Sequence, residues 1–260
     1  MSENSTAPKV SPTWATAWVT GASTGIGRDV ALLLADRGVR VAISARSAAK
    51  LDDVARLRPG MLVVPVDVTD RVAMSAAHAH ILQEFGSIDL AILNAGVWDP
   101  MEGSGYSAER AAATMAVNYT GIANALEPLI TDMIVRRSGH LALVASVAGY
   151  RGLPKAIAYA PSKAAVISLA EVLRLDLAPY KIKVSLVNPG FVETPMTAVN
   201  RFPMPYIVSS ADAAARIVKG LELQKFEIAF PWQLVAMMKL LRILPDPLYY
   251  YVVRRFIAKT

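Results

Sequence analysis

The chain has 260 residues, of which 54% are hydrophobic and 18% are charged, and it contains no cysteine. This composition excludes a disordered chain, a disulfide framework, a thiolate metal site and a cysteine nucleophile. The net charge of +6 comes from scattered Lys and Arg residues. Their scatter argues against a nucleic-acid partner and favours attraction to anionic cofactors, acyl carriers or lipid head groups.

Polar residues broken by prolines make up residues 1–13, which predicts a flexible tail and not a secretory signal. Together with the lack of cysteine, this favours a cytoplasmic protein. Nothing in the length requires a second domain. We therefore expect one α/β domain over residues 14–230, followed by an apolar and basic helical extension over 231–260.

Six short apolar runs alternate with helix-patterned segments along this domain. Continuous Val, Ile, Leu and Ala runs are typical of strands buried on both faces, and their alternation with helices indicates a parallel sheet. The chain therefore predicts a doubly wound parallel sheet. Its expected strands are 16–20, 39–45, 61–66, 88–93, 140–146 and 182–188.

A glycine-rich stretch, TGASTGIG, follows the first predicted strand at residues 20–27. Gly21, Gly25 and Gly27 stand where a strand must turn sharply into a helix while its backbone lies against a ligand. A helix starting near Ile26 would present unpaired N–H groups and a positive dipole end to a pyrophosphate. A glycine turn without a ligand is the alternative, but this position favours a Rossmann fold that binds a dinucleotide.

The end of the second predicted strand bears on the choice of dinucleotide. No acidic residue occurs between Asp36 and Asp52, and the strand end offers Ser44 and Arg46 instead. A carboxylate would bind the ribose hydroxyls of NAD, whereas a guanidinium can pair with the 2′-phosphate of NADP. The sequence therefore favours NADP(H) over NAD(H). The alternative is that Arg46 is a solvated loop charge.

Asp67 ends the third predicted strand, beside the expected adenine position. Its carboxylate could accept a hydrogen bond from an adenine amino group. Asp is equally common as a turn or N-cap residue, so both interpretations stay open.

Tyr159 and Lys163 lie four residues apart at the start of an apolar, helix-patterned segment. On a helix this spacing stacks both side chains on one face. A nearby ammonium would lower the pKa of the phenol and make it a usable general acid or base. The alternative is a core tyrosine with a lysine that extends past it to solvent.

Further polar residues are expected near the same edge of the sheet. Ser146 ends the fifth predicted strand, so its hydroxyl can donate to a carbonyl oxygen beside the phenol. Pro189 and Gly190 predict a turn with close backbone approach, and Thr194 is a candidate partner for a nicotinamide carboxamide. Asn118 lies in a predicted helix, where it either disturbs the helix to hold a water or faces solvent.

Together, these motifs resemble the short-chain dehydrogenase/reductase family across roughly residues 14–230. The matching elements, in order, are TGASTGIG (20–27), DV (67–68), NAG (94–96), Asn118, Ser146, YAPSK (159–163) and NPGFVET (188–194). One element departs from the pattern, because Leu93 stands where the family has a first Asn. That departure puts a local bracing hydrogen bond in doubt.

The resemblance implies roles for individual residues. Tyr159 would exchange a proton with the substrate oxygen, Lys163 would lower the pKa of that phenol and bind the nicotinamide ribose, Ser146 would steady the substrate oxygen, and Asn118 would hold a water. No metal is expected. The implied cofactor-binding residues are Gly21, Ser23, Thr24, Gly25, Ile26, Gly27, Arg46, Asp67, Val68, Asn94, Ala95, Gly96, Tyr159, Lys163, Pro189, Gly190, Val192 and Thr194.

Residues 195–210 contain three prolines among Met, Phe, Tyr, Ile and Val. We expect this segment to form a mobile lid over an apolar substrate, with ordinary packing as the alternative.

Two helix-patterned pieces, split at Pro245–Pro247, form the C-terminal extension, and Lys239 and Arg242 share one narrow stripe of the first. Its longest uncharged stretch, 228–238, is too short to span a bilayer. Such a helix must be buried against its own domain, a second subunit or a membrane surface, and the sequence leaves all three open. We expect a homo-oligomer, either a dimer or a tetramer.

The sequence therefore predicts an NADP(H)-dependent oxidoreductase that interconverts a ketone and a secondary alcohol on an apolar or lipid-like small molecule. Two alternatives stay open, a 3-oxoacyl-thioester reductase and a dinucleotide-binding sensor or scaffold without turnover.

Overall fold

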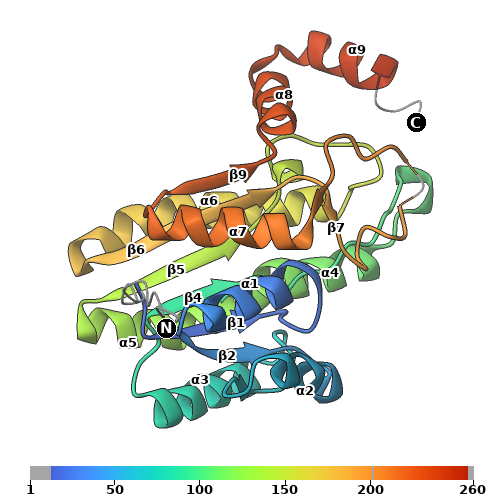
Figure 1. The fold of residues 1–260 in the computed structure, drawn as a ribbon. Coiled ribbons are helices and arrows are strands. Elements are labelled where there is room, and N and C mark those ends of the chain that lie inside the picture. The colour runs from blue at the N-terminus through green and yellow to red at the C-terminus, as the bar shows by residue number, and fades with distance from the viewer. Residues whose placement is uncertain (1–12, 201, 257–260) are drawn as a thin grey trace, which may run out of the picture.

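The computed structural model describes residues 13–200 and 202–256, and its centre is a seven-stranded sheet with helices on both faces (Figure 1). The strand order is β3-β2-β1-β4-β5-β6-β9, and every neighbouring pair is parallel. The chain crosses the sheet between β3 and β4, so a switch point lies between β1 and β4. The strands are β1 (Thr16–Thr20), β2 (Arg40–Ser44), β3 (Leu62–Val63), β4 (Leu90–Leu93), β5 (Gly139–Val144), β6 (Ile182–Pro189) and β9 (Glu227–Phe230).

Two apolar clusters hold the helices on the two faces of the sheet. One face carries α1 (Gly25–Asp36), α2 (Ala48–Leu57) and α7 (Ser210–Glu222). The other carries α3 (Arg71–Phe85), α5 (Gly121–Arg136) and α6 (Tyr159–Leu177). Since strands β1, β2 and β4 to β6 are buried along almost their whole length, both faces are dry. This confirms the predicted doubly wound fold.

The six predicted strands all occur, but the sequence missed the edge strand β9 and made β3 too long. β9 is short, begins with Glu227 and is followed by Pro231, so its apolar run is weak. Beyond β3, the backbone N–H groups of Val64 and Val66 still donate to Ile43 and Ala45. The segment therefore stays beside β2 after its regular ladder ends. Most of the expected tail, residues 1–12, lies outside the described residues.

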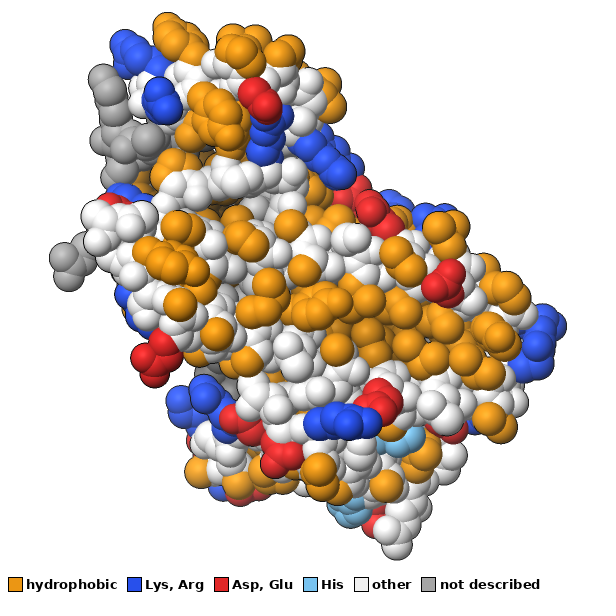
Figure 2. All heavy atoms as spheres, turned by 180° about the vertical axis from the view of Figure 1, so that it is seen from behind, with side chains coloured by type: hydrophobic (Ala, Val, Ile, Leu, Met, Phe, Trp, Pro, Cys, Tyr) orange, Lys and Arg blue, Asp and Glu red, His pale blue; other side chains and the backbone are white. Residues whose placement is uncertain are grey.

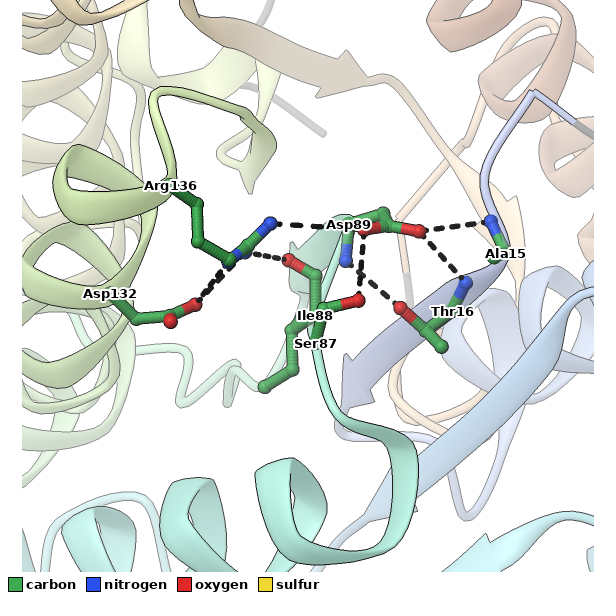
Figure 3. Close-up of polar contacts among 7 residues, drawn as sticks. All are labelled: Ala15, Thr16, Ser87, Ile88, Asp89, Asp132 and Arg136. Atoms are coloured by element: carbon green, nitrogen blue, oxygen red, sulfur yellow. Dashed lines mark hydrogen bonds and ion pairs between the residues drawn. The ribbon is translucent and has the colours of Figure 1, made fainter.

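Polar contacts around Asp89 hold together the amino-terminal ends of β1 and β4, opposite the carboxyl ends of the strands (Figure 3). Its carboxylate accepts the N–H groups of Ala15 at 3.0 Å and Thr16 at 3.3 Å, and its own N–H donates to the Thr16 hydroxyl. Arg136, at the end of α5, donates to the backbone of Ile88. One carboxylate thus aligns the starts of β1 and β4 with a helix end.

The C-terminal extension forms α8 (Trp232–Ile243) and α9 (Asp246–Phe256), which project beyond the β9 edge of the sheet (Figure 1). Leu234, Met238 and Leu241 of α8 join the core on the α5–α6 face, as do Tyr249 and Val253 of α9. The structure therefore shows that the extension packs in part on its own domain. Within the described residues, no helix combines the length and apolar character needed to cross a membrane.

A small ladder closes the base of the segment that was expected to form a lid. β7 (Val192–Glu193) pairs with β8 (Val208–Ser209), and Ser210 already belongs to α7. The loop itself therefore ends at Ile207, three residues before the boundary expected from the sequence.

Candidate active site

A cleft of about 350 Å³ opens at the carboxyl ends of the strands, across the switch point between β1 and β4. Many of the residues that the sequence assigns to the cofactor line it together. They are Gly21, Ser23, Thr24, Gly25, Ile26, Arg46, Asp67, Val68, Asn94, Ala95, Gly96 and Thr194.

The glycine turn leaves no room for side chains. Gly21 and Gly25 have φ values of 67° and 56°, which favour glycine. A Cβ atom on Gly27 would lie 2.4 Å from the carbonyl oxygen of Gly21, and one on Gly25 would lie 2.8 Å from the methyl group of Thr194. No side chain caps the start of α1, and its first turn holds no acidic residue. The turn therefore presents backbone N–H groups that suit a pyrophosphate.

Thr20, Asn94 and Ala95 brace the junction that the Leu93 departure put in doubt. The Thr20 hydroxyl accepts the N–H groups of Asn94 and Ala95 at 3.0 and 3.2 Å. The Asn94 amide donates to the carbonyls of Thr20 and Gly21 at 3.0 and 3.2 Å. Leu93 itself is buried in β4. These bonds brace the junction between β1 and the end of β4 without a polar side chain at position 93.

At the far end of the cleft lie Arg46, Ser47 and Lys50, at the start of α2. Arg46 is exposed, and no acidic side chain ends β2 beside it. Ser44, which the sequence also offered, is fully buried and accepts a hydrogen bond from the indole of Trp18 at 2.9 Å. Strand alternation turns Ser44 inward, so it is a core residue.

Asp67 shapes its own turn and also lines the cleft. One carboxylate oxygen accepts the N–H of Thr69 at 2.9 Å and its hydroxyl at 2.8 Å. The N–H bond is the main cause that lowers the pKa of this carboxyl, and the Arg46 charge lowers it further, against the effect of burial. Asp70, not Asp67, is the N-cap of α3. The structure therefore shows that Asp67 is a turn residue. Its position in the cleft is also compatible with the other interpretation, a hydrogen bond from an adenine amino group.

Tyr159 and Lys163 lie on the first turn of α6, on the side facing the ends of β4 and β5. The Lys163 ammonium is buried, donates to the carbonyl of Val144 at 3.0 Å and lies 5.6 Å from the centre of the Tyr159 ring. A Cβ atom on Gly96 would lie 3.4 Å from this ammonium. The pair therefore adjoins the cofactor cleft at the glycine that follows β4.

Burial controls the titration of this pair. It raises the pKa of the Tyr159 phenol, against a smaller lowering by a hydrogen bond with the Ser146 side chain, and it lowers the pKa of Lys163 to about 8. The sequence led us to expect Lys163 to set the phenol pKa. In this structure the raised pKa keeps the phenol protonated at neutral pH, and the Ser146 side chain is the group that lowers this pKa in part.

Asn118 lies in a π-helical turn, Ala116–Thr120, between α4 (Ala108–Met115) and α5. Its side chain is fully buried: the oxygen accepts the N–H of Val97 at 2.7 Å, and the amide donates to the Val97 carbonyl and to the Ser162 hydroxyl. Of the two interpretations, disturbance of the helix is correct and exposure to solvent is wrong. The side chain fastens the loop after β4 to α6 through both hydrogens of its amide. Its role in holding a water stays a prediction.

The predicted residues after β6 lie around the cleft to different extents. Thr194 lines it, whereas Val192 is buried in β7. The Pro189 carbonyl accepts the Ser146 hydroxyl at 3.3 Å. Gly190 faces α8, since a Cβ atom there would lie 2.5 Å from Leu234.

Sequence reasoning missed several residues of this region, among them Lys50, Met196 and Trp98. Lys50 and Met196 line the cleft. Trp98 meets the Tyr159 ring edge-on, with ring centres 4.9 Å apart. Two of these residues could have been found by their closeness in sequence to predicted site residues, because Lys50 follows Arg46 by four residues and Trp98 follows Gly96 by two. Among the described residues, no cluster of His, Asp or Glu suits a metal ion.

The fold, the glycine turn and the Ser146–Tyr159–Lys163 arrangement define a dinucleotide-dependent oxidoreductase scaffold. The short chain dehydrogenase family model matches residues 15–203, and the chain belongs to this family of oxidoreductases. An "uncharacterized oxidoreductase" of Myxococcus xanthus is 39% identical over 245 residues, which cover 92% of this chain and 96% of the relative.

Solved structures agree with this assignment. A short-chain dehydrogenase from Streptomyces avermitilis has a TM-score of 0.81 at 25% identity, covering 94% of this chain and 97% of that chain. A short chain dehydrogenase/reductase from Burkholderia phymatum in complex with NAD has a TM-score of 0.81 at 24% identity, covering 89% and 94%. The second likeness supports the fold alone.

Proposed function

We propose that this protein is an NADP(H)-dependent oxidoreductase that interconverts a ketone and a secondary alcohol on an apolar or lipid-like substrate. The observation that carries the proposal is the position of Tyr159, Ser146 and Lys163 beside the dinucleotide cleft. A nicotinamide dinucleotide would supply or accept the hydride. Every other step falls to side chains of this chain.

In the reducing direction, Tyr159 gives its phenolic proton to the substrate oxygen as negative charge develops there. The raised pKa of this phenol keeps it protonated at neutral pH. The Ser146 hydroxyl donates a second hydrogen bond to the same substrate oxygen. Lys163, with a pKa of about 8, carries a charge at neutral pH that stabilises the phenolate left behind.

Arg46 and Lys50 support the choice of NADP(H). Both are cationic, both line the far end of the cleft, and no acidic side chain ends β2. A guanidinium and an ammonium suit a 2′-phosphate, which an acid at this place would repel. The NAD in the Burkholderia phymatum structure makes NAD(H) the competing choice.

The direct test compares Tyr159→Phe with the wild type in a screen of carbonyl compounds followed by NADPH absorbance. Loss of the proton donor should lower kcat by about 10²- to 10⁴-fold, while NADPH binding, followed by fluorescence, is retained. Tyr106→Phe removes an exposed hydroxyl and is the matched control. Thioester substrates in the panel test the 3-oxoacyl alternative. A wild type that binds NADPH but turns over nothing would favour the sensor.

We further propose that two uncovered apolar faces meet partners. Figure 2 shows a band of hydrophobic side chains across the back of the molecule, the side on which α5 and α6 lie. Val135, Val172 and Leu175 are exposed there. This face suits a second copy of the chain, and hence a homo-oligomer.

The outer face of α8 and α9 suits a different partner. Leu240, Ile243 and Tyr251 are 57%, 77% and 63% exposed on it. These helices also carry Lys239, Arg242, Arg254 and Arg255 against the single acid Asp246. Apolar side chains beside basic ones suit peripheral contact with an anionic membrane surface.

A further inference from the structure

Trp98 connects the reacting phenol to the segment that follows β7. Its ring meets Tyr159 at an interplanar angle of 83° and a centre-to-centre distance of 4.9 Å. Its indole N–H donates to the side-chain oxygen of Asn200 at 2.9 Å, across 102 positions of sequence. One side chain therefore touches both the candidate proton donor and the 195–200 segment.

The two ends of this connection are anchored differently. Val97, next to Trp98, is held on both its N–H and its carbonyl by the buried Asn118 amide. Asn200 lies in a loop fastened mainly at its base, where β7 pairs with β8, and through Thr197, whose hydroxyl donates to Val192. The hydrogen bond thus joins a rigid wall of the site to a more exposed loop.

Exposure within that loop supports the same distinction. Val199 is 62% exposed and Met196 is 39% exposed, although Met196 lines the cofactor cleft. Few buried apolar contacts therefore keep 195–200 in place, and a single directed hydrogen bond has a large share in its position. The Asn200 amide also donates to the sulfur of Met204 at 3.3 Å, which orients its oxygen toward the indole.

We propose that Trp98 is a positioning residue: its indole N–H latches the 195–200 segment over the reacting end of the substrate, and its ring fixes one side of Tyr159. The inference rests on the proposed function and deepens it. Because the ring occupies the space on one side of the phenol, the substrate carbonyl must approach from the other.

The two tasks of Trp98 can be separated by substitution. Trp98→Phe keeps an aromatic ring beside Tyr159 but removes the N–H donor. Asn200→Ala removes the acceptor of the same bond and leaves the ring in place. Loss of one hydrogen bond corresponds to about a fivefold effect. Each variant should raise KM about fivefold with kcat little changed, and the double variant should be no worse than either single variant.

Trp232→Phe is the matched control, because Trp232 is 72% exposed on α8, away from the cleft. It should leave KM unchanged. Thermal unfolding of each variant shows whether the protein still folds as the wild type does. A structural brace would lower the unfolding temperature or kcat without a selective change in KM.

A second measurement does not need turnover. Amide hydrogen exchange over residues 195–200 of the NADPH-loaded protein should be about fivefold faster in Trp98→Phe and in Asn200→Ala than in the wild type. If the wild type shows no turnover, the proposed function fails while this measurement still decides the latch. Unchanged exchange and KM in both variants, or fully additive effects in the double variant, would overturn the inference.

Discussion

The guanidinium of Arg151 lies 3.9 Å from the centre of the Tyr249 ring, and this contact joins the loop after Ser146 to α9. The same guanidinium donates to the carbonyls of Leu241, Arg242 and Leu244 and pairs with Asp246. These carbonyls belong to the end of α8, so one side chain caps α8 and orients α9. The connection places the extension on its own domain.

Arg151→Ala should therefore release α9. Several hydrogen bonds to carbonyls that become uncapped would be lost, and we expect a loss of about 2–3 kcal/mol in the free energy of unfolding. Limited proteolysis at 244–248 should become faster. Arg174→Ala, which removes a guanidinium stacked on Phe226 at 4.5 Å, is the control and should cost about 1 kcal/mol or less. Equal losses in the free energy of unfolding for the two variants would show that Arg151 does not hold α9 in place.

Local pattern was enough to predict the elements that carry the site. The spacing of Tyr159 and Lys163 placed both on one helix face, and the poor helix propensity of Asn118 indicated a disturbed helix as one of two interpretations, where the structure has a π-helical turn. Such features depend on neighbours within a few residues. The direction of Ser44, by contrast, depends on which face of β2 packs on Trp18, and its partner lies 26 residues away.

Longer-range features left no local trace. The bond between Trp98 and Asn200 joins a strand end to a distant loop, and nothing in either segment indicates it. The position of α8 likewise involves Arg151, whose guanidinium donates to the carbonyl of Leu241, 90 positions further along the chain. Sequence reasoning therefore left three partners open for that helix: its own domain, a second subunit or a membrane surface.

Arg46→Asp tests whether Arg46 recognises the 2′-phosphate of NADP(H). An acid in place of the guanidinium would repel the 2′-phosphate, and we expect NADPH affinity to fall about 10- to 100-fold while NADH affinity changes little. Fluorescence titration with both cofactors measures this. Arg56→Asp makes the same charge change on the exposed side of α2, outside the cleft, and should preserve the preference. Equal weakening of both cofactors would show that Arg46 does not read the phosphate.

Asp89→Ala tests the alignment of β1 and β4 shown in Figure 3. The variant leaves the N–H groups of Ala15 and Thr16 without their acceptor, so we expect a loss of about 2 kcal/mol in denaturant unfolding. Arg71→Ala breaks only an exposed pair with Glu127 and should cost at most about 1 kcal/mol. A similar cost for both would argue against an alignment role for Asp89.

Vesicle flotation tests the membrane proposal for α8 and α9. Binding should be seen with vesicles that contain phosphatidylserine and be absent with neutral phosphatidylcholine alone, because the basic side chains need anionic head groups. Leu240→Asp and Arg254→Glu should each weaken it severalfold. Leu175→Asp, on the α6 face, should leave flotation unchanged and weaken self-association in ultracentrifugation instead. If Leu175→Asp weakened flotation and Leu240→Asp weakened self-association instead, the α6 face would be the membrane surface and the α8–α9 face the subunit contact.

His140 makes the stability of the fold depend on pH. Burial in β5, with a smaller effect of the Lys183 charge, lowers its pKa from 6.5 to about 4. Above pH 6.5 the imidazole is neutral in both the folded and the unfolded chain, and this group contributes no pH dependence. Between pH 6.5 and 4 only the unfolded chain takes up the proton, so stability should fall by about 1.4 kcal/mol per pH unit.

His140→Asn should flatten this slope in urea unfolding at pH 7, 6 and 5. Part of the slope should remain, because burial also lowers the pKa of His78. His80→Asn, on the exposed side of α3, should keep the full slope. A wild-type slope retained by His140→Asn would contradict the assignment.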